Sequence, residues 1–261
     1  MTGMIRGVGP DLRDFTPARV SLPTTGDSIA TAEVLRFQLS HAQARDAVLA
    51  ALHLPSFAQR LKSELPVLSD ASIAVLELRT NAGDRAAYLR QPNLGRTLDA
   101  ESAALLKRGL YDLAITVADG LSALAVERNV IPLLGALLPE LVTAEWRVAP
   151  ITVVAQGRVA IGDPIGSLLG ARMGLVLIGE RPGLSSPDSL GAYLTWEPCP
   201  VRTDADRNCL SNIREGGLSA EVAAARLLWY LQAARAKRCT GIALKEGAAV
   251  LEGGVVTDLP L

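Results

Sequence analysis

The stretch YDLAITVADGLSALAV, residues Tyr111–Val126, decides the fold class. Its first part, Tyr111–Val117, is a short continuous apolar run bounded by polar residues, which is typical of a strand buried on both faces of a sheet. The residues Asp119-Gly120-Leu121-Ser122 end this run and lead into helical sequence. A buried strand followed by a turn and a helix is the repeating unit of α/β proteins.

The same alternation continues toward the C-terminus. Further strands are expected at Ile151–Ala155, Leu175–Gly179, Ala192–Trp196 and Gly241–Lys245. Helices are expected from Asp99 to about Arg108, over Ile131–Arg147, along the segment with Gly162, Gly166 and Gly170, and from the capping residue Ser219 to about Ala236. Residues 96–261 are therefore predicted to form a Rossmann-like α/β domain with an open, mostly parallel sheet.

Residues 1–95 are predicted to form a mainly helical region. Apolar residues at steps of three, four and seven place one stripe along a long helix from about Ser28 to Leu54, which Pro55 is expected to end. A short helix is expected over Phe57–Glu64. The alternating pattern of Ile73–Arg79 fits either a strand or a helix, and Gln91–Gly95 is the candidate linker between the two regions.

The composition narrows the possible functions. Of 261 residues, 20% are charged and 49% are hydrophobic, with a formal net charge of −1, which excludes a disordered chain and argues against nucleic-acid binding. No apolar stretch approaches the ~20 residues that cross a bilayer, and residues 1–19 lack the apolar core of a secretory signal. Three widely spaced cysteines indicate a reducing compartment. A cytoplasmic protein is expected.

Three polar segments are expected at strand ends, where open α/β sheets bind ligands. They are Gln156–Asp163, Gly179–Gly191 and Asp204–Arg214, and they concentrate glycine, hydroxyl, carboxylate and guanidinium groups. Glycines let the backbone approach a ligand closely. Ordinary turn chemistry with surface ion pairs would also explain any one of these segments, so a ligand site depends on their convergence.

Familiar catalytic motifs are absent from the sequence. The string GLSSP at 183–187 fails GxSxG at its last position, and the sequence contains neither a phosphate-binding P-loop nor an HExxH zinc motif. A nucleophilic Cys209 would need a histidine base, but His41 and His53 both lie in the N-terminal region. No catalytic residue and no metal ligand is assigned to this chain.

Seven sequence strings carry a resemblance to a known family. They are TPARVSLP (16–23), HAQARDAV (41–48), NLGRTL (93–98), ADGLSALAV (118–126), GRVAIGDPIG (157–166), LIGERPGLSSPDSLG (177–191) and DADRNCLSNIR (204–214). With these strings, the chain resembles the light (small) chains of ethanolamine ammonia-lyases from about Thr16 to Lys245. The last two strings are the longest and most specific.

The resemblance implies an activity and a cofactor. The complete enzyme converts ethanolamine to acetaldehyde and ammonia through radical chemistry that adenosylcobalamin initiates. A barrel-shaped heavy chain holds the substrate, and the light chain completes the cobalamin site, in a hetero-oligomer with six copies of each chain. Val159, Glu180 and Cys209 match the family's cobalamin contacts. Neither histidine lies in a DxHxxG motif, so this chain is not expected to ligate cobalt.

The resemblance also bears on location and partners. Some members enter a bacterial microcompartment and carry a longer N-terminal segment, whereas about fifteen residues precede Thr16 here, so encapsulation is not expected. The helical region 1–95 is expected to dock on the heavy chain. Glu180 is expected to accept hydrogen bonds from cobalamin amides, with an ion pair to Arg181 as the alternative. A stand-alone enzyme acting on a nucleotide or acyl substrate and a purely structural subunit remain competing functions.

Overall fold

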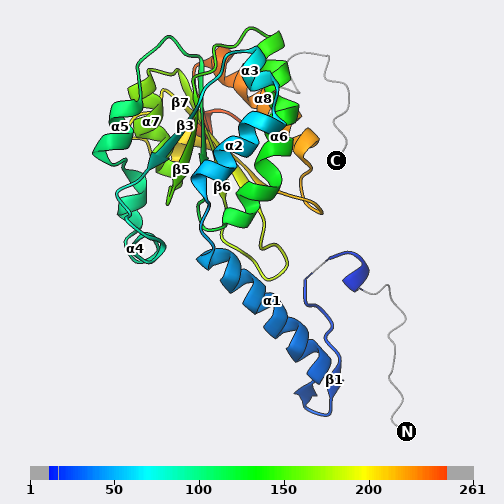
Figure 1. Ribbon diagram of the computed structural model, residues 1–261. Coiled ribbons are helices and arrows are strands. Elements are labelled where there is room, and N and C mark those ends of the chain that lie inside the picture. The colour runs from blue at the N-terminus through cyan, green and yellow to red at the C-terminus, as the bar shows by residue number, and fades with distance from the viewer. Residues whose placement is uncertain (1–11, 17, 246–261) are drawn as a thin grey trace, which may run out of the picture.

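The computed structural model describes residues 12–16 and 18–245 as a layered α/β body from which one long helix projects (Figure 1). The main sheet contains, in spatial order, β3 (Val75–Arg79), β5 (Ile151–Ala155), β4 (Leu113–Ala118), β6 (Met173–Gly179), β7 (Leu190–Trp196) and β8 (Arg207–Ile213). The α-helices are α1 (Thr31–Leu49), α2 (Leu54–Glu64), α3 (Val67–Asp70), α4 (Arg85–Arg90), α5 (Ala100–Leu105), α6 (Ala123–Thr143), α7 (Gly162–Leu169) and α8 (Ala220–Lys237). Short 3-10 turns are η1 (Leu12–Asp14), η2 (Pro92–Arg96), η3 (Val159–Ile161), η4 (Asp204–Asp206) and η5 (Gly241–Ala243), and β1 (Thr24–Thr25) and β2 (Ser28–Ile29) form a small hairpin.

The expected α/β class is confirmed, but the sheet is mixed. The neighbours β3-β5-β4-β6 are parallel, whereas β7 runs antiparallel to β6 and β8 antiparallel to β7. The prediction of a mostly parallel sheet therefore holds for four strands only. The connection from β6 to β7 spans just residues 180–189, too few for the helical crossover that a parallel neighbour requires.

Alternate residues of the strands face two different layers of helices. In β4, Leu113, Ile115 and Val117 belong to the larger apolar cluster, which also contains residues of α2, α6 and α8. Ala114 and Ala118 belong to a smaller cluster with residues of η3 and α7. The two-residue period of a strand thus buries both faces of the sheet, with α2, α6 and α8 on one side and α7 on the other (Figure 1).

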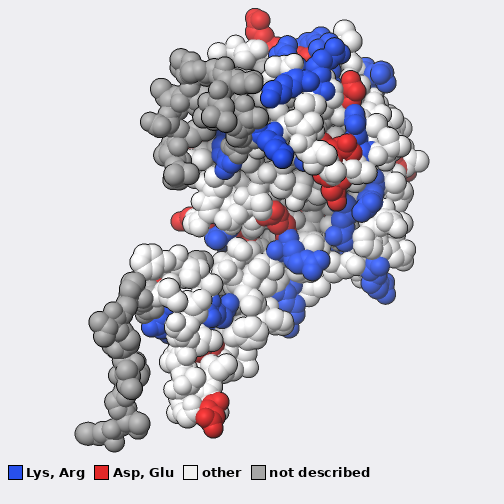
Figure 2. Space-filling model, turned by 180° about the vertical axis from the view of Figure 1, so that it is seen from behind, with Lys and Arg blue, Asp and Glu red and all other residues white. Residues whose placement is uncertain are grey.

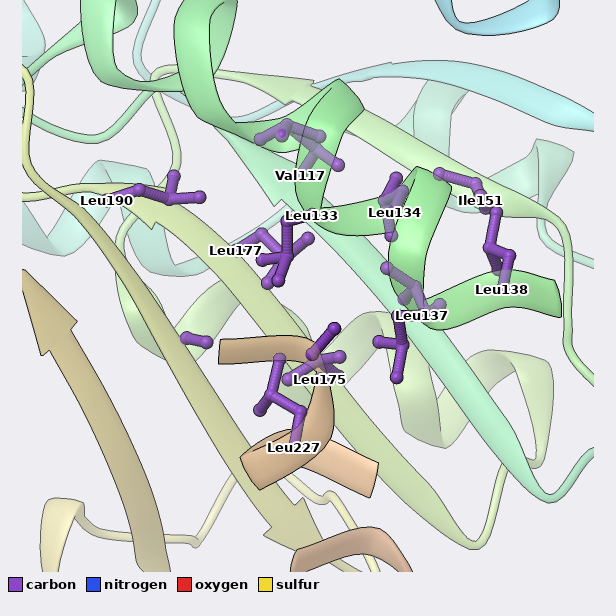
Figure 3. Packing of buried hydrophobic residues seen from close by; sticks show 14 of the residues in the cluster. Val117, Leu133, Leu134, Leu137, Leu138, Ile151, Leu175, Leu177, Leu190 and Leu227 are labelled. Atoms are coloured by element: carbon purple, nitrogen blue, oxygen red, sulfur yellow. The ribbon is translucent and has the colours of Figure 1, made fainter. Parts of the chain in front are cut away.

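Helix α6 is the centre of the larger cluster. It begins at Ala123, where the Ser122 hydroxyl accepts a hydrogen bond from the backbone N–H of Ala125, so it starts earlier than the expected Ile131. Figure 3 shows its leucines meeting side chains of the strands and of α8. Ten of its residues are buried, although the helix contains Pro132 and Pro139. Burial of this apolar surface outweighs the cost of two prolines inside the helix.

Two predictions about the C-terminal part are wrong. The segment Asp204–Arg214 is not a strand-end loop, because Arg207–Ile213 forms the edge strand β8 paired with β7. The expected strand Gly241–Lys245 is instead the turn η5, which begins at Gly241 in the left-handed region with φ 75°. The side chain of Asn208 accepts from the N–H of Gly241 and donates to the carbonyl of Leu244, so these groups are bonded without a neighbouring strand.

The N-terminal region is helical in part and also contributes to the sheet. Helix α1 ends at Leu49, and Pro55 lies in the first turn of α2, where a missing N–H costs nothing, so Pro55 does not end the first helix. Within Ile73–Arg79, the residues of β3 are a strand that pairs in parallel with β5. The sheet therefore draws strands from both sides of the expected division at residue 95.

Over residues 12–16 and 18–245, the structure contains no helix that combines the length and the apolar character needed to cross a membrane.

Candidate functional site

The candidate site lies where the parallel strands β4, β5 and β6 end. Helix α6 follows β4 on one face of the sheet, and α7 follows the neighbouring β5 on the other face. Such a change of side opens a crevice at the carboxyl ends of two adjacent strands, where open α/β sheets bind ligands. The segments that enter this crevice are Asp119–Ser122 after β4, Gln156–Arg158 after β5 and Glu180 after β6.

A pocket of about 240 Å³ opens at this edge of the sheet. Its lining residues come from α4, from the segments after β4 and β5, from the end of β6 and the segment after it, and from β7. They are Tyr88, Gly120, Leu121, Arg158, Val159, Ile178, Gly179, Glu180, Arg181 and Tyr193. Two of the three site residues identified from the sequence, Val159 and Glu180, therefore line one pocket.

Backbone contact between two glycines brings the segments after β4 and β6 together. Gly120 has φ 56°, and a Cβ atom there would lie 2.2 Å from the carbonyl oxygen of Gly179. A Cβ atom on Gly179 would lie 2.0 Å from the carbonyl oxygen of Ser122. Both positions thus exclude any side chain, and the two loops meet backbone to backbone beside the pocket.

A buried carboxylate lies behind these glycines. Asp119 Oδ1 accepts from the N–H of Gly157 at 3.2 Å, and Oδ2 lies 3.4 Å from an Nη atom of Arg85. Burial raises the pKa of Asp119 to about 6, while Arg85 and nearby backbone N–H groups lower it. The same guanidinium donates to the carbonyl of Gly120 at 2.7 Å and, through Nε, to the carbonyl of Val48 in the last turn of α1. Arg85 thus joins the projecting helix to the strand ends.

Glu180 is the most highly connected side chain of the pocket. Its carboxylate accepts hydrogen bonds from the hydroxyls of Ser189 and Ser211 and from the backbone N–H of Asn212. These three groups come from the start of β7 and from β8, so Glu180 links three neighbouring strands at their ends. Among the described residues, no ion pair joins Glu180 to Arg181; serine hydroxyls and one N–H satisfy the carboxylate instead.

Cys209 lies beside the pocket rather than in its wall. It is the cross-strand partner of Tyr193, which lines the pocket. Packing around the sulfur raises the pKa of the Cys209 thiol, and the negative charge of Glu180 adds to this rise. Burial likewise raises the pKa of Tyr193. Both groups therefore stay protonated near neutral pH, which suits hydrogen bonding and not nucleophilic attack.

An aromatic ring in contact with two cations forms another part of the pocket wall. The guanidinium carbon of Arg158 lies 4.0 Å from the ring centroid of Tyr88, and that of Arg85 lies 4.9 Å from it. The Tyr88 hydroxyl donates to the carbonyl of Gly157, and burial raises its pKa to about 12. These contacts fix the loop that carries Val159, whose side chain packs against the smaller apolar cluster.

Sequence reasoning missed four residues of this region. Asp119 stands directly after a buried strand, a signal that could have been used, whereas Arg85, Tyr88 and Tyr193 carry no local signal. In the sequence, Tyr193 looks like any other strand residue. Only the pairing of β7 with β8 places it beside Cys209, in the pocket that Glu180 also lines. The two histidines lie elsewhere: His41 is on α1, and His53 caps α2 through Ser56.

Larger hollows exist outside this pocket. One of about 470 Å³ is lined by Arg172, Trp196, Glu197, Arg235 and Arg238, at the opposite end of the strands from Glu180. Another of about 460 Å³ lies beside the edge strand β3. Within residues 12–16 and 18–245, no cluster of three or more His, Cys, Asp or Glu side chains is arranged to hold a metal ion.

Comparison with known proteins adds an independent result. The sequence profile described as "ethanolamine ammonia-lyase light chain" matches residues 9–245. A protein of Bradyrhizobium diazoefficiens named ethanolamine ammonia-lyase small subunit is 51% identical over 243 residues, covering 92% of this chain and 90% of the relative. Proteins with the same name from Azotobacter vinelandii and Pseudomonas fluorescens are 51% and 49% identical, and the matches cover 92% and 95% of this chain and 88% and 91% of the relatives.

Proposed function

The chain belongs to the ethanolamine ammonia-lyase light-chain family, and from this premise we propose that it is the small subunit of a radical ammonia-lyase that completes an adenosylcobalamin site. The observation that carries the proposal is the convergence of Val159, Glu180 and the Tyr193–Cys209 pair at one pocket on the ligand-binding edge of the sheet. The complete enzyme would convert ethanolamine to acetaldehyde and ammonia.

The chemistry of the pocket fits the edge of a corrinoid. Cobalamin presents several neutral amide side chains, each with N–H donors and a carbonyl acceptor. Glu180 offers a carboxylate acceptor, while Arg158, Arg181 and the Tyr193 hydroxyl offer donors. The pocket is far too small to enclose a corrinoid, so this chain would cover one side of the cofactor and leave the rest to a partner.

The chain's own role would be to bind and to orient. When bound, the cofactor supplies the radical chemistry through homolysis of its cobalt–carbon bond. Glu180 and its neighbours would hold the amide groups at the rim, and the apolar side chain of Val159 would exclude water beside them. The protonated thiol of Cys209 and the Tyr193 hydroxyl would contribute neutral contacts. With no nucleophile–base pair assigned here, the isolated chain is expected to lack lyase activity.

A heavy chain is the partner that the proposal requires. Helix α1 projects from the body and exposes Val34, Leu35, Phe37 and Leu39 (Figure 1). The projecting part is mostly uncharged in Figure 2. We propose that this helix, within the region 1–95, docks on the heavy chain in a hetero-oligomer with six copies of each chain.

The test uses light chain co-expressed with heavy chain and titrated with adenosylcobalamin. Replacing Glu180 by Ala should weaken cofactor binding by about 1.5–3 kcal/mol, or roughly 10- to 150-fold. Glu180→Gln keeps one acceptor oxygen and should lose less. Turnover at saturating cofactor should largely recover in both variants, because the lost interaction belongs to binding.

Two results would contradict the assignment. Wild-type cofactor affinity in the Glu180→Ala enzyme would remove Glu180 from the cofactor site. A large turnover defect at saturation would mean that the side chain acts in the reaction itself. Co-purification with the heavy chain in normal yield is the control for folding, since Glu180 also bonds to β8.

A further inference from the structure

We propose that Ser189 and Ser211 are positioning residues, which orient the Glu180 carboxylate so that one acceptor site on Oε1 remains free for an amide N–H of the cofactor. The inference rests on the proposed cobalamin-binding function and extends it to two residues that the family resemblance did not identify. It follows from the arrangement of donors around the carboxylate, which the fold supplies from two different strands.

The donors divide unequally between the two carboxylate oxygens. Oε2 accepts from the Ser189 hydroxyl and from the backbone N–H of Asn212 at 3.2 Å. Oε1 accepts from the Ser211 hydroxyl at 2.6 Å. Each carboxylate oxygen has two lone-pair positions, so the described residues use both positions of Oε2 and one of the two on Oε1. The carboxylate is thereby fixed in orientation while keeping a single acceptor direction.

The backbone around Glu180 is shaped for this arrangement. Asn212 has φ 60°, and the pairing of β7 with β8 shifts register between Leu190 and Ala192, so the ladder is interrupted where its N–H points to Glu180. Gly191 lies beneath the side chain, where a Cβ atom would come within 3.0 Å of Glu180 Oε1 and 2.8 Å of the Tyr193 ring. Strand β8 therefore supplies the N–H donor, and Gly191 of β7 leaves the space that the carboxylate fills.

The charge of Glu180 stays available to a ligand. Its donors in the described part of the chain are two hydroxyls and one backbone N–H, and none is a guanidinium or an ammonium group. An ionised acceptor without a cationic partner forms stronger hydrogen bonds to a neutral amide than a neutral acceptor does. Glu180 and Tyr193 both line the pocket, and both lie beside Gly191.

The experiment is a double-mutant cycle in the co-expressed complex of light and heavy chains. The variants are Ser211→Ala, Glu180→Ala and the two combined, and the readout is the dissociation constant of adenosylcobalamin from the change in its visible absorption. Ser211→Ala should weaken binding about 3- to 10-fold in the wild-type background, the scale of one ordinary hydrogen bond, because the cofactor is affected only through the orientation of the carboxylate. In the Glu180→Ala background the same change should have less than about a 2-fold effect.

Variants of Ser189 provide a second, independent test. Ser189 is buried, and it donates to the other oxygen, so Ser189→Ala should give a loss of similar size, and the variant Ser189→Ala/Ser211→Ala should approach the loss of Glu180→Ala. Ser211→Thr keeps the hydroxyl on an exposed strand position and should restore near wild-type affinity. Ser185→Ala, in the same loop but exposed, is the matched control and should leave affinity unchanged.

The outcomes separate this inference from the function on which it rests. If Glu180→Ala weakens binding and neither serine variant does, the positioning role is wrong and the cofactor site stands. If Ser211→Ala costs the same with and without Glu180, Ser211 acts independently of the carboxylate, which also overturns the inference. If Glu180→Ala has no effect, the proposed cofactor role of Glu180 fails together with it. Thermal unfolding of each complex identifies a variant whose loss reflects misfolding.

Discussion

Helices α1 and α6 have similar lengths but opposite surroundings. Helix α6 places ten residues in the core, among them Leu134 and Leu137 with no exposed surface. Helix α1 buries only Ala47 among its 19 residues and leaves Leu39 61% exposed. Figure 1 shows the difference directly: α6 lies against the sheet, and α1 extends away from it.

This difference shows that an apolar stripe on a helix indicates a contact surface, but not whether the contact lies within the chain or with another protein. The stripe of α6 faces the sheet and α8 within the same chain (Figure 3). The stripe of α1 finds no such cover in residues 12–16 and 18–245. A row of large apolar side chains exposed along a helix marks an interaction site. The following experiments test whether α6 serves folding and α1 serves assembly.

The largest effect is expected for a truncation in α6. Leu134→Ala should lower the free energy of unfolding by about 2–5 kcal/mol, because it removes buried methyl groups and leaves a cavity. The matched change in α1, Leu39→Ala, should alter it by less than about 0.5 kcal/mol. Urea unfolding of the two variants measures both values. Equal losses would show that α1 is packed against the body in solution, which would contradict separate roles for α1 and α6.

The next effect concerns a side chain that joins the two regions. Arg85 bonds the carbonyl of Val48 in α1 and the buried carboxylate of Asp119, which precedes α6. Arg85→Leu removes the partner of that carboxylate and should lower the free energy of unfolding by about 2–3 kcal/mol at pH 7. Arg85→Lys, which keeps the charge but not the fork of donors, should lose less. An unchanged free energy of unfolding in Arg85→Leu would show that these contacts of Arg85 do not stabilise the fold.

The pH dependence of that loss follows from Asp119. Its pKa of about 6 in the folded chain is above the value of about 3.9 expected for an unfolded aspartate. This group therefore contributes stability below about pH 4 that is lost as the pH rises through about 6. Removing Arg85 raises the folded pKa further, so the loss should be larger at pH 7 than at pH 5. Unfolding midpoints at the two pH values check the sign, and a larger loss at pH 5 would contradict it.

The smallest effect on folding is expected for a charge reversal on α1. The Arg45 side chain is 64% exposed and contacts its neighbour Asp46, a surface pair that contributes little. Arg45→Glu should leave the unfolding midpoint nearly unchanged while reducing co-purification with the heavy chain, since a reversed charge at an interface opposes binding. Arg60→Glu, on α2, is the control for a surface charge on the body. Unchanged co-purification of Arg45→Glu would place the docking surface elsewhere.

Several elements followed from the sequence because their signals are local. The run Leu113–Ala118 is buried at every position, as a continuous apolar strand between two layers must be. Asp99 and Ser219 cap helices through their own side chains, as expected from their residue types. The helix expected along the segment with Gly162, Gly166 and Gly170 is α7, but it ends before Gly170, which adopts the left-handed conformation that favours glycine.

Other elements did not follow, because a distant partner decides them. The polar segment that forms β8 contains no apolar run, and only its pairing with β7 makes it a strand. Gly241–Lys245 has the composition of a strand, but the side chain of Asn208, 33 residues before Gly241, bonds its backbone groups. The stripe of the long N-terminal helix was visible in the sequence, whereas its exposure depends on what the rest of the chain covers.

The candidate site shows the same division. The sequence by itself determined the α/β class and the family, and it proposed Val159, Glu180 and Cys209 as site residues, because apolar runs, turn residues and motif strings are properties of short segments. Only the tertiary structure decided that Glu180 bonds two serines rather than Arg181, and that Tyr193 and Cys209 are cross-strand partners. The contacts made by Ser211 and Cys209 depend on the antiparallel pairing of β7 and β8, which brings together residues 31 positions apart, as between Glu180 and Ser211. No local pattern encodes such a pairing, because its free energy comes from packing between strands and not from either segment alone.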